Sequence, residues 1–120
     1  MDLLGVHHVS INVTDLDEAL AFYRDTLGLK VLENRPDDVI DVDGAWLSCP
    51  DGREIHLLVN ELPELKGQHW AFEVGDIEST VATLTAAGRK VSKPSEMTGI
   101  CRQVFCKDPA GNLVEFNQRL

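Results

Sequence analysis

The chain has 120 residues, of which 43% are hydrophobic and 26% charged, a size and composition that predict one compact globular domain. Its net charge of −9 and pI near 4.7 argue against nucleic acid or an anionic membrane surface as a partner. No apolar run approaches the roughly 20 residues of a membrane span, and no secretory signal is apparent. Three cysteines without a C-x-x-C motif predict reduced thiols and a cytoplasmic location.

The first predicted elements are a strand and a helix. The stretch VSINV, residues 9–13, alternates apolar and polar residues, as a half-buried strand does. In the following TDLDEALAFYRDTLG, Thr14 or Asp15 is a suitable helix N-cap, and Glu18 completes a capping-box spacing from Asp15. Apolar residues then recur at helical spacing, at Leu16, Ala19, Leu20, Tyr23 and Leu27. Gly28 suits the left-handed residue that ends a helix.

The second half of the chain repeats this plan. QHWAFEVGDIESTVATLTAAG reads as a strand and a helix, with Asp76 as the cap and Gly88 as the stop. Two later segments, GAWLSCPDGREIHLLV and CRQVFCKDPAGNLVEFN, also match each other as two strands joined by a turn. We therefore predict two βαβββ modules, residues ~5–60 and ~67–118, with a linker at ~61–66.

The repeat aligns four side chains of types that can bind a metal. His8 matches His69, and His56 matches Glu115. Because side chains alternate along a strand, His8, His69 and Glu115 should lie on the faces away from the helices. His7 should lie on the helix side of its strand, near the strand end, in a structural role.

Three further residues are candidates for substrate binding. They are Trp46, Gln103 and Asn117, all on strands near the predicted ligand face. For Trp46, a place in the hydrophobic core is the alternative.

The stretches HHVSINVTDLDEALAFYRDTLGLKV, REIHLL, QHWAFEVGDIE and FCKDPAGNLVEFNQ resemble the vicinal-oxygen-chelate superfamily, most closely its small glyoxalase I-like members. The superfamily also includes bleomycin- and fosfomycin-resistance proteins and extradiol dioxygenases. The resemblance implies an α+β fold, in which two paired βαβββ modules form a curved eight-stranded mixed sheet with a cleft. It further implies a homodimer, a small substrate with two adjacent oxygens, and a divalent metal held by His8, His56, His69 and Glu115.

Position 56 departs from the glyoxalase I pattern, which usually has Glu where this chain has His56. Three histidines and one carboxylate suit Zn, Ni, Fe or Mn better than Mg or Ca. His56 could instead hydrogen-bond a water bound to the metal.

The resemblance implies a glyoxalase-like lyase or isomerase, in which Glu115 moves a proton through a metal-bound enediolate. Glutathione is then a candidate thiol cosubstrate. Three alternatives stay open: an extradiol-type dioxygenase, a fosfomycin-type thiol transferase, and a metal-free drug-binding protein of the bleomycin-resistance kind.

Overall fold

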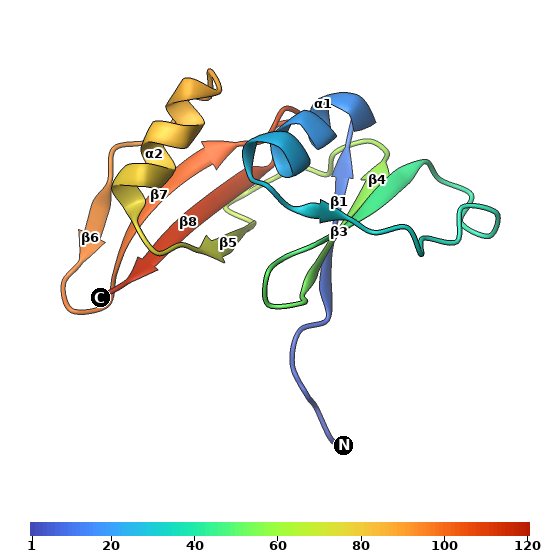
Figure 1. Ribbon diagram of the computed structural model, residues 1–120, viewed down its shortest axis with the longest axis horizontal. Helices are drawn as coiled ribbons and strands as arrows, with labels where there is room; N and C mark the ends of the chain where they lie inside the picture. The colour runs from blue at the N-terminus through green and yellow to red at the C-terminus, as the bar shows by residue number, and fades with distance from the viewer. The chain divides into compact units, whose positions relative to one another are not determined.

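The computed structural model describes all 120 residues, which divide into two compact units, Met1–Pro63 (unit 1) and Glu64–Leu120 (unit 2). Unit 1 contains β1 (His8–Val13), α1 (Leu16–Leu20), the π-helix η1 (Ala21–Thr26), β2 (Lys30–Val31), β3 (Gly44–Ser48) and β4 (Glu54–Val59). Unit 2 contains β5 (His69–Glu73), α2 (Ile77–Ala86), β6 (Ser95–Met97), β7 (Cys101–Lys107) and β8 (Leu113–Arg119) (Figure 1). No helix has the length and apolar content that crossing a membrane requires.

The two units share one sheet topology. The strand orders are β1-β4-β3-β2 and β5-β8-β7-β6, and the first strand of each unit pairs in parallel with the last. All other strand pairs are antiparallel. This topology confirms the predicted α+β class with two βαβββ repeats. The eight strands were predicted as one curved mixed sheet, and the structure has them in two four-stranded sheets.

The helical segment of unit 1 begins as predicted but continues differently. The Asp15 carboxylate accepts the Glu18 backbone N–H at 2.9 Å and so caps α1. From Ala21 onward the segment is a π-helix, in which the Leu27 N–H bonds to the Phe22 carbonyl at 2.9 Å. Phe22 and its neighbour Tyr23 are both fully buried. Of these two residues, the predicted α-helical stripe included Tyr23 but not Phe22.

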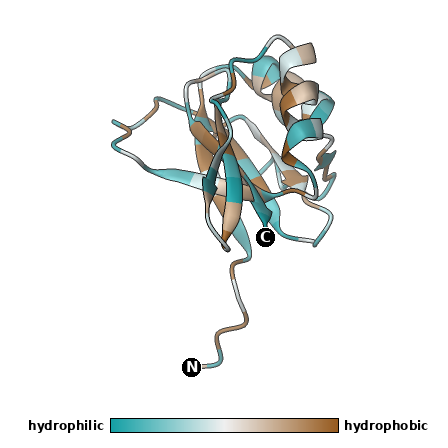
Figure 2. Ribbon diagram, turned by 90° about the vertical axis from the view of Figure 1, so that its left-hand side faces the viewer, coloured by the Kyte–Doolittle hydropathy of each residue, from teal (hydrophilic) through white to brown (hydrophobic).

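Each unit has a hydrophobic core on one face of its sheet. The largest fully buried side chains are Val13, Phe22, Tyr23, Leu47 and Leu57 in unit 1, and Ile77, Leu84, Val104 and Val114 in unit 2. α1 lies against β4, and α2 lies against β7 and β8. Figure 2 shows hydrophobic and hydrophilic residues alternating along the strands, so one face of each sheet is left for polar side chains.

The segment that joins β7 to β8 is held by one carboxylate. Oδ1 of Asp108 accepts the backbone N–H groups of Ala110, Gly111 and Asn112 at 2.8–3.0 Å. Gly111 adopts a φ of 104°, which favours glycine. The DPAGN motif is therefore a rigid turn that fixes where β8, and with it Glu115, begins.

Candidate functional site

In unit 2, neighbouring strands bring His69 and Glu115 together. β5 and β8 run in parallel, and Nε2 of His69 lies 3.1 Å from Oε1 of Glu115. The other carboxylate oxygen, Oε2, accepts the side-chain amide of Asn117 at 2.8 Å. Glu115 is only 8% exposed, so a buried carboxylate is held from two sides.

The hydrogen bonds of His69 show what this pair can bind. Its Nδ1 lies 2.8 Å from the carbonyl oxygen of Gly67, which accepts only if Nδ1 carries a proton. In the neutral ring, Nε2 then has a lone pair facing the Glu115 carboxylate, and a proton or metal cation must lie between them. An imidazole nitrogen and a carboxylate oxygen are both donor types that zinc and its neighbouring transition metals accept. The pair therefore fits a divalent metal.

In unit 1, the rings of three residues form a stack on the face away from the helix. The His56 ring lies between His8, at a centroid distance of 4.0 Å, and Trp46, at 4.3 Å. The rings are within 12° of parallel. Trp46 pairs directly with His56 across β3 and β4. The stack buries His56 and limits its ring to small movements.

Glu54 fixes the remaining freedom of the His56 ring. Oε1 of Glu54 lies 2.8 Å from Nε2 of His56, and the two residues share a face because they are two apart on β4. The hydrogen bond from His56 holds the pKa of Glu54 below its ordinary value. With Nε2–H donated to this carboxylate, the neutral ring offers its lone pair at Nδ1.

His8 is suited to metal binding by its charge state. Although His8 is exposed, partial desolvation, followed by the proximity of His56 and His7, lowers the pKa of His8 below its ordinary value. A histidine must be neutral to ligate a metal, so this shift favours the ligating form.

His7 lies directly before β1, beside His8. Its Nδ1 is 2.8 Å from Nδ1 of His8, and it is exposed. β1 begins at His8, and the Glu54 N–H donates to the His7 carbonyl at 3.2 Å.

The structure therefore places the predicted site residues in two groups. Unit 1 gathers His8, His56 and Trp46, and unit 2 gathers His69, Glu115 and Asn117. Gln103 pairs with Asn117 across β7 and β8. Neither unit alone collects three His, Cys, Asp or Glu side chains in a metal-holding cluster.

Two residues of these groups were not predicted from sequence. Glu54 contacts His56, and Phe105 contacts the His69 ring edge-on at 5.4 Å. The sequence spacing indicates the contact of Glu54 with His56, because residues two apart on a strand share a face. Phe105 pairs with Glu115 across β7 and β8, a register that the turn at Asp108 determines.

Two βαβββ modules of the same strand order define a class of α+β proteins built from an internal repeat. Residues 5–116 match the family model of the Glyoxalase/Bleomycin resistance protein/Dioxygenase superfamily, and the chain belongs to this superfamily.

Individual relatives agree with this assignment. The chain is 31% identical over 124 residues to the lactoylglutathione lyase of Haemophilus influenzae, covering 94% of this chain and 91% of that protein. A crystal structure of a protein assigned to the glyoxalase family from Bacillus anthracis has a TM-score of 0.86 and 27% identity, covering 100% and 98%. FosX, a fosfomycin resistance protein of Listeria monocytogenes, shares the fold; a variant complexed with Mn(II) and a dihydroxypropylphosphonic acid has a TM-score of 0.84, 18% identity and coverage of 99% and 95%.

Proposed function

We propose that this protein is a metal-dependent glyoxalase-like lyase, which isomerises the adduct of a 2-ketoaldehyde and a thiol such as glutathione. The buried His69–Glu115 pair carries the proposal, because it combines a metal donor with a carboxylate able to take a proton. The similarity to a lactoylglutathione lyase over nearly the whole chain supports this reaction over the other activities of the superfamily.

The proposed ligands are His8, His56, His69 and Glu115, and the proposed ion is Zn, Ni, Fe or Mn. The Mn(II) complex of the FosX variant supports a divalent ion for this fold. When bound, the ion polarises the two adjacent oxygens of the substrate as a Lewis acid.

The residues of the chain then have distinct tasks. Glu115 takes the proton from the carbon that bears sulfur and a hydroxyl group, and returns it to the neighbouring carbonyl carbon. The hydroxyl proton passes to the former carbonyl oxygen, which yields a thioester of a 2-hydroxy acid. Asn117 holds Glu115 through Oε2, and the Gly67 carbonyl orients His69. Trp46 and Gln103 bind the body of the substrate.

The test begins with protein purified without chelator or histidine tag. Metal content is measured by mass spectrometry, and thioester formation is followed with methylglyoxal and glutathione. We expect near-stoichiometric metal and an activity that falls by about 10²–10⁴-fold in Glu115→Gln. Glu73→Gln, an exposed carboxylate on β5, is the matched control and should retain activity. Activity that survives Glu115→Gln unchanged would overturn the role of Glu115.

An extradiol-type dioxygenase is the second candidate, and one observation favours it. Three of the four proposed ligands, His8, His69 and Glu115, are the two-histidine, one-carboxylate set of non-haem iron oxygenases. Oxygen consumption by the iron-loaded protein with catechol, undiminished in His56→Ala, would establish this candidate. Absence of consumption would reject it.

We also propose that the protein acts as a homodimer. Size-exclusion chromatography with light scattering should give twice the chain mass of 13.3 kDa. The three cysteines are free thiols, which supports the cytoplasm as the compartment.

A further inference from the structure

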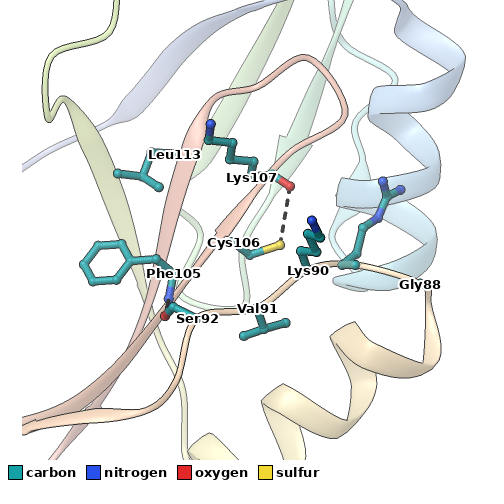
Figure 3. Close-up of a pocket in the computed structure, with 9 residues that line it drawn as sticks. Gly88, Lys90, Val91, Ser92, Phe105, Cys106, Lys107 and Leu113 are labelled. Carbon is teal, nitrogen blue, oxygen red and sulfur yellow. Dashed lines mark hydrogen bonds between the residues drawn. The ribbon is translucent and has the colours of Figure 1, made fainter.

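A pocket of about 720 Å³ opens within unit 2, and none of the four proposed metal ligands lines it (Figure 3). Residues 88–92, residues 105–107 and Leu113 line it. A volume in this range suits a small organic molecule.

Backbone pairing holds the pocket's two walls together. After α2, the chain turns at Gly88, with a φ of 78°, and runs beside β7. Val91 pairs with Cys106, the Ser92 N–H donates to the Phe105 carbonyl at 2.9 Å, and the Phe105 N–H donates to Ser92 Oγ at 2.8 Å. The lining residues of both segments are therefore fixed relative to each other.

The lining is positively charged although the protein is acidic. Arg89, Lys90 and Lys107 line the pocket, and no Asp or Glu does. The ion pairs of unit 2 use Lys66, Arg102 and Arg119, which leaves Lys90 and Lys107 without a carboxylate partner.

The wider charge distribution favours the same region. Unit 2 contains seven Lys or Arg and seven Asp or Glu residues, so the net charge of −9 resides in unit 1. Burial raises the pKa of the Cys106 thiol, so the pocket contains no thiolate that would repel an anion. The lining thus carries positive charge. The carboxylate that acts electrostatically on Cys106 is Asp108, which does not line the pocket and whose Oδ1 accepts backbone N–H groups of the β7–β8 turn.

The remaining lining is apolar, with one hydroxyl. Phe105, Val91 and Leu113 provide apolar surface. Ser92 Oγ accepts the Phe105 N–H, which leaves its own proton for donation to a ligand oxygen. A ligand that satisfies all of these groups has an apolar body and an anionic head.

The pocket adjoins the His69–Glu115 pair within unit 2. Phe105 contacts the His69 ring at 5.4 Å, and Leu113 is the residue paired with His69 across β5 and β8. Phe105 and Leu113 therefore belong both to the pocket lining and to the surroundings of His69.

We infer that this pocket binds an amphipathic organic anion, a carboxylate or phosphate on an apolar body, with Lys90 and Lys107 holding the anionic head. If the proposed function holds, this anion is the tail of the substrate whose adjacent oxygens meet the metal. That second statement rests on the proposed function, whereas the binding of the anion does not.

The binding test uses the full-length, metal-free protein and three probes: 4-phenylbutyrate, phenyl phosphate and the neutral 4-phenylbutanol. Titrations are followed by amide chemical shifts and calorimetry. We expect both anions to shift the amides of Val91, Ser92, Phe105 and Lys107, and the tighter of the two identifies the preferred head group. The double variant Lys90→Gln/Lys107→Gln should weaken anion binding by about ten-fold or more, since one ten-fold step is the loss of a single charged contact.

The matched control is Lys30→Gln/Lys66→Gln, which also removes two positive charges, but at residues that do not line the pocket. It should bind both anions as the wild type does. The inference is overturned if neither anion binds, if 4-phenylbutanol binds as tightly as the anions, or if the control variant loses as much affinity as the pocket variant.

A kinetic arm separates this inference from the proposed function. For 2-ketoaldehyde adducts of anionic thiols, the pocket variant should raise KM and leave kcat unchanged, with no effect on adducts of neutral thiols. A protein that binds the anions but turns over no adduct would contradict the proposed function and leave the pocket assignment standing. Turnover without anion binding would contradict only the pocket.

Discussion

At the scale of single residues, Asn117 and Gln103 face each other across β7 and β8 but have different surroundings. The Asn117 amide donates to Oε2 of Glu115 at 2.8 Å, whereas Gln103 makes no such bond to that carboxylate. Both were predicted as substrate-binding residues. Strand alternation cannot distinguish a residue that orients a metal-ligating side chain from one that contacts the substrate.

Replacing Asn117 by Ala should therefore affect metal binding. Without its hydrogen bond, the Glu115 carboxylate can rotate, and groups that orient ligands are typically worth about 10–100-fold in metal affinity. Isothermal titration with Zn²⁺ measures this change. The control, Gln103→Ala, should keep the metal affinity and raise only KM; equal metal affinity in both variants would assign Asn117 to the substrate instead.

Glu54 should determine which nitrogen of His56 carries the proton. In the wild type and in Glu54→Gln, an oxygen still accepts the Nε2–H, so we expect a single tautomer with the proton on Nε2. In Glu54→Ala this acceptor is lost, and both tautomers should be populated. Long-range ¹H–¹⁵N correlation spectra of the metal-free protein report the tautomer, and one unchanged tautomer in Glu54→Ala would show that the stack alone fixes the ring.

At the scale of elements, the sequence predicted where both helices begin but not how the first continues. Asp15 and Asp76 are recognisable because an N-cap needs a side-chain oxygen just before an apolar periodic stretch. The π-helix was missed because the apolar stripe from Leu16 to Leu27 fits an ordinary α-helix equally well. Phe22 and Tyr23 are adjacent and both buried, which depends on tertiary packing. The spacing of apolar residues in the sequence does not predict it.

The Asp15 cap should contribute measurably to stability. Asp15→Ala leaves the Glu18 N–H without its acceptor and should lower the free energy of unfolding by about 1 kcal/mol. Asp15→Asn keeps a capping oxygen and should stay near the wild-type value. Urea unfolding followed by circular dichroism compares the three proteins, and equal losses in both variants would indicate that the charge, not the cap, matters.

The ion pair between Glu78 on α2 and Arg102 on β7 should make stability depend on pH. The hydrogen bond from Arg102 lowers the pKa of the Glu78 carboxyl in the folded state. The folded state therefore binds fewer protons at Glu78 than the unfolded state does. The ion pair's contribution to the free energy of unfolding is then complete above the ordinary pKa of glutamate. It is lost as the pH falls through the lowered value.

Because Glu78 is well exposed, the effect should be small. Glu78→Gln should lower the melting temperature slightly at neutral pH and converge with the wild type in acid. A difference between the two proteins that grows as the pH falls would have the wrong sign for this pair.

At the scale of the whole molecule, the internal repeat carried most of the prediction. Matching His8 with His69 and His56 with Glu115 anticipated equivalent strands in two sheets of one topology. It did not anticipate that the equivalent pairs would differ, with stacked rings in unit 1 and a hydrogen-bonded His–Glu pair in unit 2. That difference arises from Trp46 and Glu54, whose counterparts in unit 2 are Phe105 and Leu113.

If both units supply metal ligands, loss of a ligand from either unit should weaken the stabilisation of the chain by the metal. An ion that binds only the folded state adds about 2.7 kcal/mol at a free concentration 100 times its Kd. We expect Zn²⁺ to raise the melting temperature of the wild type, and His8→Ala and His69→Ala each to abolish most of that rise. His7→Ala is the control, since His7 contacts His8 but is not a proposed ligand. A rise in melting temperature that survives His8→Ala but not His69→Ala would show that the metal binds only to donors of unit 2. The His69–Glu115 pair, which lies within that unit, would then be the metal site.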